Sequence, residues 1–306
     1  MRAAASVLLL VLLVSGVAPW PTAHGEGVAL TFDDLPLNGD LPPGMSRVRI
    51  VDELLAILRA RAVPQVYGFV NGVKLEGSAD AAAALTRWAA GGQALGNHTY
   101  GHPDLHRTGV EEFIADVRRD EPVLELLDPG GPWRWFRYPY LREGETRAKR
   151  AEVRARLFER GYRIAEVTLD YEDYLWNSAH ARCIAQGDAP SIARLRATYL
   201  QAAAAYLDAG RQASRRLFGR DIQHVLLLHL GSFSSTILPD LLDLLQAKGF
   251  TLVTLAEAES DPAYAADVDA ASSFDGSLLE QLIDARGLEY PPVPAKPYRE
   301  LEALCR

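Results

Sequence analysis

The sequence predicts a single α/β domain built on a parallel sheet of about seven strands, enough to curl into a barrel. Short β-prone runs alternate with longer amphipathic stretches, and acids and histidines gather where the runs end. Strands that alternate with helices are typical of parallel sheets. The 306 residues show no internal repeat or long linker, and their 48% apolar content suits one large globular domain.

Residues 1–25 resemble a secretory signal peptide. Arg2 supplies a positive start, an apolar run follows to Val14, and small residues precede Gly25. A membrane anchor is the alternative, but the apolar run is short for a span. We therefore expect cleavage after Gly25 and export, periplasmic or secreted, without a stable membrane anchor.

The remaining elements follow in order along the chain. Expected strands cover Val28–Phe32, Gln65–Val70, Ala94–Asn97, Trp135–Tyr138, Arg163–Thr168, Val225–His229 and Thr251–Thr254. Expected helices cover Arg47–Arg61, Ala79–Ala90, Val110–Leu127, Arg147–Arg160, Ile192–Leu217 and Leu238–Lys248. Ser78 and Thr108 suit helix N-caps, and Gly161 and Gly249 suit helix ends.

Two segments depart from this alternation. Leu175–Arg220 is long for one crossover, so we expect an extra helix or a covering loop there. After Gly287 four prolines argue against regular structure. We therefore place the catalytic domain at residues 26–286 and a Pro-rich tail, wrapping the outside, at residues 287–306.

Charge and cysteine content exclude several classes of function. A formal charge of −8 argues against a nucleic-acid partner and against attraction to anionic lipid. Cys183 and Cys305 lack the spacing of a metal site, and either a disulfide or two free thiols fits an exported chain. The sequence does not predict the oligomeric state.

Acids and histidines end the first and third strands. Asp33 and Asp34 follow a buried run, where adjacent carboxylates are costly unless they pair or bind a cation. His98 and His102 share one face if they lie one helical turn apart. Two histidines and one carboxylate can hold a zinc-type ion with a position left open for water. A turn or cap role for the acids is the alternative.

Three further strands end in polar groups on the same rim, where parallel α/β folds build their sites. Arg137 can pair with a carboxylate, and His229 closes an apolar strand, where a buried structural histidine is the alternative. Asp170 to Tyr174 interleaves acids with aromatic rings, which suits either a sugar groove or a solvated acidic loop.

Five ordered motifs together resemble the polysaccharide deacetylases that share the NodB homology domain and form carbohydrate esterase family 4. The motifs are Thr31-Phe32-Asp33-Asp34, His98-Thr99-Tyr100-Gly101-His102, Arg137-Tyr138-Pro139-Tyr140, Asp170-Tyr171-Glu172-Asp173-Tyr174 and Leu227-Leu228-His229. The resemblance extends from about Val28 to Leu255. It implies a distorted (β/α) barrel of about seven strands and removal of acetyl groups from a carbohydrate polymer or oligomer. We expect N-acetyl groups in preference to O-acetyl groups, with O-acetyl as the alternative.

The resemblance also implies a divalent metal ion and its ligands. Asp34, His98 and His102 would bind the metal, and Asp33 would be the general base, oriented by Arg137. Zinc is the ion expected, with cobalt, nickel or manganese as alternatives.

The same resemblance assigns the proton donor and the substrate contacts. His229 would be the general acid, with its pKa tuned by Asp173 rather than Asp170. The backbone N–H of Tyr140 would stabilise the oxyanion, and Asp170 and Tyr174 would contact substrate.

The chain departs from the family pattern at three places. Leu35 replaces the usual Gly of the first motif, and we expect its bulk near the pocket mouth to narrow the range of substrates. Tyr174 replaces a common Trp and would stack differently on a sugar. The insertion at Leu175–Arg220 could cover the groove.

Two other functions compete with carbohydrate deacetylation. The same site could hydrolyse a small non-sugar amide, imide or ester, which would show no dependence on oligosaccharide length. A non-catalytic glycan-binding protein could keep the barrel, but it would not need both a base and an acid. The partner expected is therefore an acetylated glycan.

Overall fold

The computed structural model describes residues 26–266 and 276–306, so the expected leader at residues 1–25 lies outside the described residues. Within this range seven strands form one parallel sheet. They are β1 (Gly27–Leu35), β2 (Tyr67–Val70), β3 (Ala94–Asn97), β4 (Trp135–Phe136), β5 (Arg163–Ile164), β6 (His224–His229) and β7 (Thr251–Leu252). Every expected strand is present, although β4, β5 and β7 end earlier than expected.

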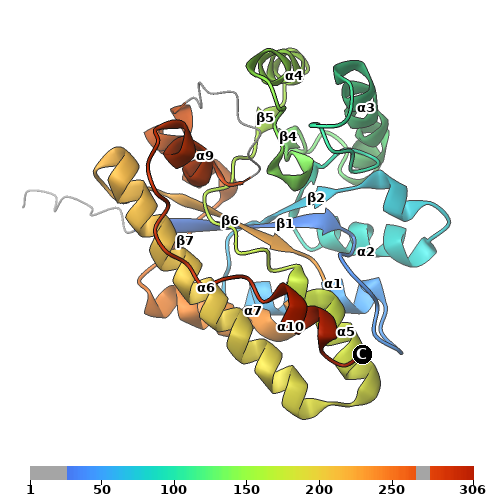
Figure 1. Ribbon diagram of the computed structural model, residues 1–306. Helices are drawn as coiled ribbons and strands as arrows, with labels where there is room; N and C mark the ends of the chain where they lie inside the picture. The colour runs from blue at the N-terminus through green and yellow to red at the C-terminus, as the bar shows by residue number, and fades with distance from the viewer. Residues whose placement is uncertain (1–25, 267–275) are drawn as a thin grey trace, which may run out of the picture.

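Helices surround the sheet (Figure 1). They are α1 (Arg47–Ala60), α2 (Ala79–Ala90), α3 (Val110–Leu127), α4 (Arg147–Glu159), α5 (Leu175–Gln186), α6 (Ala189–Phe218), α7 (Ser234–Ala247), α8 (Leu255–Ala258), α9 (Leu278–Ala285) and α10 (Tyr298–Ala303). Three short 3₁₀ helices, η1 (Gly72–Leu75), η2 (Pro139–Leu141) and η3 (Pro262–Ala265), lie in the connections. None of the helices in the described part of the chain is long and apolar enough to cross a membrane.

The sheet curls into a half-barrel with the strand order β5-β4-β3-β2-β1-β6, while β7 pairs with β1. The segment after β5 turns back to β6, where Leu169 bridges Leu226 in parallel register. The amide of Leu227 donates to the Leu169 carbonyl at 3.0 Å. This return brings the fourth and fifth motifs together, and it confirms the predicted barrel class.

The alternation of side chains along β1 separates two cores. Val28, Leu30 and Phe32 belong to the large apolar cluster beneath the helices. Ala29 belongs to a smaller cluster inside the curl of the sheet. Because successive strand residues face opposite sides, Asp33 follows Ala29 toward the inside. The edge of the sheet where Asp33 lies is therefore continuous with the barrel interior.

The helix termini test the caps that the sequence predicts. The Ser78 hydroxyl accepts from the Ala81 amide and caps α2 as expected. Thr108 does not cap α3, whose N-cap is Gly109 without a side-chain bond, so that prediction is wrong. Gly161 and Gly249 follow α4 and α7 with φ values of 78° and 80°, where glycine avoids the Cβ penalty.

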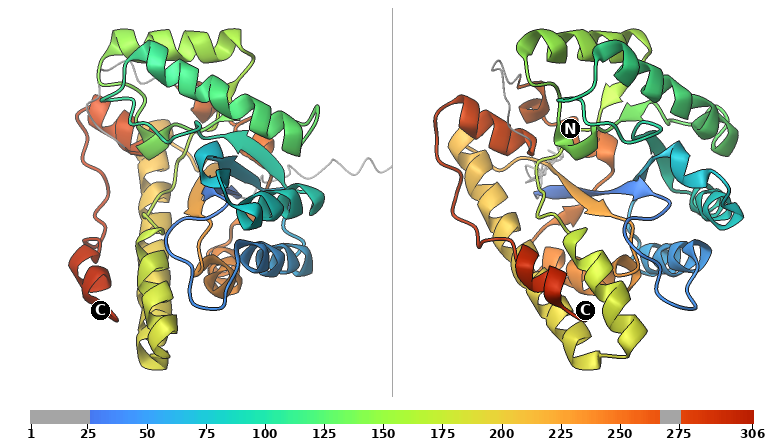
Figure 2. Two further views of the ribbon diagram at one scale, coloured as in Figure 1. Left: turned by 90° about the vertical axis from the view of Figure 1, so that its right-hand side faces the viewer. Right: turned by 45° about the vertical axis from the view of Figure 1, so that its right-hand side comes forward.

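The long segment after Tyr174 folds as α5 and α6, the extra helical structure expected there. The tail is only partly irregular, because α10 forms at Tyr298–Ala303. All four prolines of the tail precede this helix, and Pro297 is its N-cap, so they do not interrupt it. From α9 the tail crosses α6 and brings α10 beside α5, as Figure 1 and both views of Figure 2 show.

Candidate active site and metal centre

The two acids of the first motif face one pocket because β1 is irregular at its end. Adjacent strand residues normally point to opposite faces. Here the register with β2 shifts between Phe32 and Leu35, and Asp34 has a φ of 66°. Such an irregularity re-aims a side chain. Asp33 and Asp34 consequently line the same cavity.

His98 and His102 lie in the loop after β3, and not one helical turn apart as the spacing suggested. Thr99 and His102 have φ values of 66° and 58°, and the His102 amide donates to the Thr99 hydroxyl at 3.0 Å. This tight turn brings the two imidazole centroids within 4.8 Å. The histidines therefore share a site through loop geometry.

Asp34, His98 and His102 form the one group in residues 26–266 and 276–306 whose carboxylate and imidazole atoms could together hold a metal ion. One ligand atom from each lies within 4.8 Å of the others. His98 Nδ1 lies 2.8 Å from the Arg137 carbonyl, which fixes the ring and leaves Nε2 for an ion. Two imidazoles and a carboxylate fit zinc and related divalent ions.

Burial and local charges together keep these ligands in the forms that bind cations. Burial lowers the pKa of His98 well below its usual value and also lowers the pKa of His102. Burial opposes ionisation of Asp34, but the charges of Lys74 and His229 hold its pKa below the usual range. Metal ligands must be neutral imidazole and ionised carboxylate, so the group is prepared for an ion at neutral pH.

Asp33 is held by the buried Arg137. Arg137 NH1 lies 3.2 and 3.4 Å from the two Asp33 oxygens, while its Nε donates to the Ala165 carbonyl at 2.7 Å. Burial raises the pKa of Asp33 to about 6, and the Arg137 charge limits the rise. Asp33 is therefore largely ionised at neutral pH yet close to the range in which a carboxylate takes up a proton.

His229 lies beside Asp33 on the neighbouring strand and is paired with Asp173. The β1–β6 register aligns Asp33 with His229. One Asp173 oxygen is 2.7 Å from His229 Nδ1, and the other accepts from the His229 amide at 2.9 Å. Burial disfavours the imidazolium, but the Asp173 carboxylate raises the pKa of His229 to about 9. Asp170 is not bonded to this imidazole and instead accepts from the Glu172 amide.

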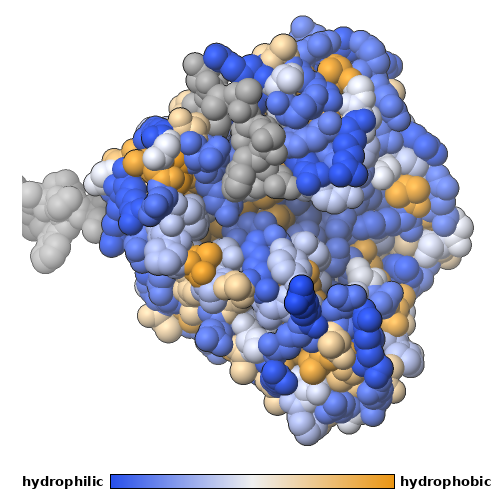
Figure 3. All heavy atoms as spheres, in the orientation of Figure 1, coloured by the Kyte–Doolittle hydropathy of each residue, from blue (hydrophilic) through white to orange (hydrophobic). Residues whose placement is uncertain are grey.

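The pocket that unites these groups has a volume of about 530 Å³. Tyr140, Asp170 and Tyr174, all predicted contacts, line its wall. Tyr174 meets the His229 ring edge-on at 5.1 Å. Figure 3 shows that the surrounding surface is hollowed near its centre and mainly hydrophilic.

The sequence did not single out four polar residues that also line the pocket. They are Asn38, Lys74, Glu280 and Lys296. Lys74 donates to the Asp34 carboxylate at 3.0 Å, and Asn38 donates to its other oxygen at 2.8 Å. Asn38 lies in a loop, Lys74 in η1, Glu280 in α9 and Lys296 in the C-terminal tail, all outside the five motifs.

Leu35 is not near the pocket mouth, contrary to the expectation from its motif. Its side chain is fully buried in the large apolar cluster. It fills the space over Gly68, where an added Cβ would lie 2.2 Å from Leu35 Cδ2. The departure from the usual Gly is thus accommodated in the core and does not shape the groove.

Comparisons with known proteins find a matching family model and solved structures of similar fold. Residues 21–158 match the family model of polysaccharide deacetylases. A chitin deacetylase from Colletotrichum lindemuthianum is 31% identical over 150 residues, which are 48% of this chain and 52% of that protein. The solved structure of the chitin deacetylase from that fungus has a TM-score of 0.52 at 24% identity, covering 77% of this chain and 88% of that one.

These likenesses do not by themselves assign an activity. The chain spans about half the length of the curated relative it matches. A family 4 pseudoenzyme from Bacillus anthracis has a TM-score of 0.51 at 16% identity, covering 77% of this chain and 66% of that one. The family match also ends before Asp173 and His229. Catalytic competence must be judged from the site itself.

Proposed function

We propose that this chain, whose residues 21–158 match the family model of polysaccharide deacetylases, is a metal-dependent hydrolase that removes acetyl groups from a carbohydrate polymer or oligomer. The catalytic domain extends over residues 26–286, and zinc is the resident ion. The single observation that carries the proposal is that one pocket is lined by three metal-type ligands, by the Asp33 carboxylate held by an arginine, and by a histidine paired with an aspartate.

The base and the oxyanion donor act on the acetyl carbonyl. A divalent ion held by Asp34, His98 and His102 would acidify a water and polarise the carbonyl oxygen. Asp33 takes the proton of the attacking water, and Arg137 keeps the carboxylate aimed at it. We assign the backbone N–H of Tyr140, on the pocket wall, to the developing oxyanion.

His229 completes the reaction by protonating the leaving group. Its pairing with Asp173 keeps the imidazole oriented and protonated at neutral pH. Release of the sugar amine requires the proton from His229, because an amide nitrogen is a poor leaving group as an anion. The raised pKa of His229 therefore supports N-acetyl over O-acetyl groups as the preferred target.

The wall around the chemical centre supports a sugar substrate. Tyr140 and Tyr174 are 54% and 38% exposed, and both line the pocket, as does Asp170. Exposed rings can stack on pyranose faces, and carboxylates can accept from hydroxyls. The leader-like residues 1–25 and the disulfide between Cys183 and Cys305 support export, since disulfides persist in oxidising compartments.

Acetate release tests the proposal directly. Mature protein is stripped with a chelator, refilled with zinc, and assayed on N-acetylglucosamine oligomers of increasing length and on acetylated xylan. We expect release only after refilling, with N-acetylglucosamine oligomers preferred and longer oligomers better than short ones. Zinc binding without acetate release from either polymer would refute the deacetylase assignment. Equal rates on short and long substrates would favour a small-amide hydrolase.

A further inference from the structure

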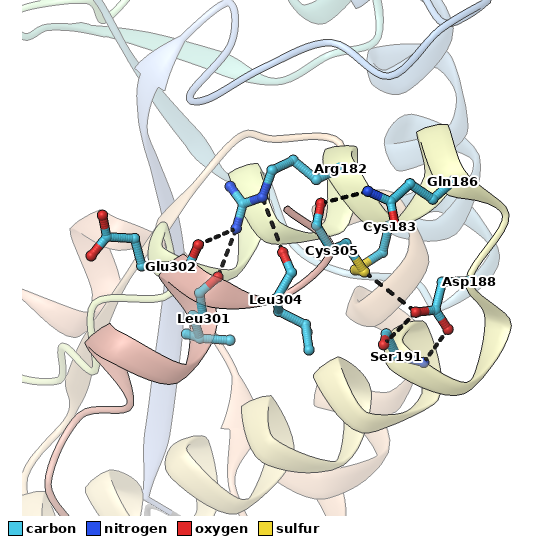
Figure 4. Close-up of a disulfide and its surroundings, with 9 residues drawn as sticks. All are labelled: Arg182, Cys183, Gln186, Asp188, Ser191, Leu301, Glu302, Leu304 and Cys305. Atoms are coloured by element: carbon cyan, nitrogen blue, oxygen red, sulfur yellow. Dashed lines mark hydrogen bonds between the residues drawn. A yellow bond between two sulfur atoms is a disulfide. The ribbon is translucent and has the colours of Figure 1, made fainter.

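The C-terminal residues 288–306, which we term the strap, are fastened at both ends. Near the start, Arg216 donates to the Glu289 carbonyl at 2.7 Å. At the end, Cys305 forms a disulfide with Cys183 of α5 (Figure 4). Arg182 donates to the Leu301 and Leu304 carbonyls at 2.7 and 3.1 Å beside that disulfide. The strap is therefore held against the domain by covalent and polar contacts.

Between these anchors the strap reaches the active-site pocket. Lys296 lines the pocket, and its Nζ lies 2.5 Å from one Glu172 oxygen. The Tyr298 hydroxyl donates to the other Glu172 oxygen. The side chains of Lys296 and Glu172 are only 21% and 22% exposed, so water competes weakly for this pair. Both oxygens of Glu172 are thus bound by the strap.

Glu172 occupies a backbone conformation that needs such support. Its φ is 56°, a left-handed value that is unfavourable for a residue other than glycine. Its amide donates to Asp170 at 2.7 Å within the same loop. Conformations of this kind persist where the surroundings hold them in place. The contacts from Lys296 and Tyr298 supply that hold.

The loop that Glu172 fixes carries the partner of the proposed general acid. Asp173 is the next residue, and it binds both the ring and the amide of His229. Tyr174 follows and packs its ring against His229. A change in the Glu172 backbone would therefore be passed directly to the residues that orient the imidazole.

We infer that Lys296 and Tyr298 are positioning residues: by clamping Glu172 they hold the Asp170–Tyr174 loop in the geometry that aims Asp173 at His229. The disulfide anchors the segment that delivers them. The effect on turnover rests on the proposed deacetylase function, whereas the effect on the loop does not. The strap is accordingly a working part of the active site and not only a cover.

Replacing Lys296 tests the inference. Lys296→Met keeps the length of the side chain and removes the ammonium. We expect kcat to fall about tenfold with KM within about twofold, because a small misplacement of a catalytic group lowers turnover. Lys296→Arg should restore most of kcat, because a cation returns to Glu172. Glu300→Gln is the matched control, since it breaks an exposed strap pair with Arg194 and should change neither constant.

Hydrogen exchange reports on the clamp without relying on turnover. In Lys296→Met the peptide that contains residues 170–174 should exchange faster than in the wild type and in Glu300→Gln. The double variant Cys183→Ser/Cys305→Ser should show the same acceleration, and if it fails to fold, the Lys296 variants decide.

Three results would overturn the inference: unchanged exchange, unchanged kcat in an active enzyme, or a change confined to KM, which would make the strap only a groove wall. If the zinc-loaded wild type releases no acetate, the proposed function fails. The exchange comparison then still decides whether the strap holds the loop.

Discussion

Replacing Asp173 with asparagine should move the alkaline limit of activity to lower pH. As the proposed general acid, His229 must be protonated, so activity should be lost as pH rises through its pKa. Burial lowers that pKa, and the Asp173 carboxylate raises it to about 9. The Asp173→Asn variant keeps the burial of His229 and loses the neighbouring charge. The Asp34 and Asp33 carboxylates remain, so the pKa of His229 should fall from about 9 toward its usual 6.5.

The size of the effect follows from these values. The rise from 6.5 to about 9 corresponds to roughly 3 kcal/mol at 1.36 kcal/mol per pKa unit. At pH 8 a group with a pKa of about 9 is roughly nine-tenths protonated, whereas one at 6.5 is roughly 3% protonated. The fall in kcat/KM at pH 8 should reach about thirtyfold. A bound cation repels the imidazolium, so the wild-type limit lies at or below about 9.

The assay is acetate release from a soluble N-acetylglucosamine oligomer between pH 5 and pH 10. The wild type should give a bell-shaped kcat/KM, and Asp173→Asn should lose its alkaline half. Asp170→Asn is the control, because that acid lies in the same pocket without a bond to His229. An alkaline limit shared by the wild type and Asp173→Asn, or one shifted equally by Asp170→Asn, would refute the assignment of Asp173.

Three other substitutions separate base, ligand and core. Asp33→Asn should lower kcat by about 10²–10⁴-fold while one zinc still binds per chain, since it removes the proposed base and spares the ligands. Metal content and acetate release are measured, and near-normal turnover would exclude Asp33 as the base. Asp34→Ala should lose both the zinc, measured after dialysis, and the activity; full zinc occupancy would remove it from the ligand set. Leu35→Ala should lower the free energy of unfolding by about 3–5 kcal/mol in denaturant titrations, because the Leu35 side chain is fully buried. A wider substrate range at unchanged stability would instead indicate that Leu35 shapes the substrate groove.

Sequence patterns predicted the barrel because they record burial. The run Val225–Leu228 is a continuous apolar strand, and it lies buried beside β1. The amphipathic stretches at Ala79–Ala90 and Val110–Leu127 have the bounds of the observed helices. Such patterns reflect which face of an element meets the core, and that is a local property of the chain.

The same patterns could not place Lys296 or Leu35. Lys296 lies in the strap, which crosses α6 and is tied to α5 by the disulfide of Cys305. No local periodicity encodes that path. Leu35 belongs to a functional motif, but the space over Gly68 decides where its side chain goes. The prolines correctly predicted irregular chain up to Pro297, yet the helix that follows depends on packing beside α5.

Backbone strain at the rim explains why the site was harder to predict than the fold. Among the described residues, six of the eight non-glycine residues with positive φ lie in the motif segments or next to them. They are Asp34, Thr99, His102, Tyr140, Leu141 and Glu172. Each such conformation costs of order 1–3 kcal/mol and persists where surrounding contacts impose it. His98 and His102 lie close together because the loop turns at Thr99. Interpreting their spacing as one helical turn does not predict this loop. The left-handed conformation of Glu172 in turn makes the Asp173 loop dependent on the strap, so the loss of these contacts should reach His229 before it affects the core.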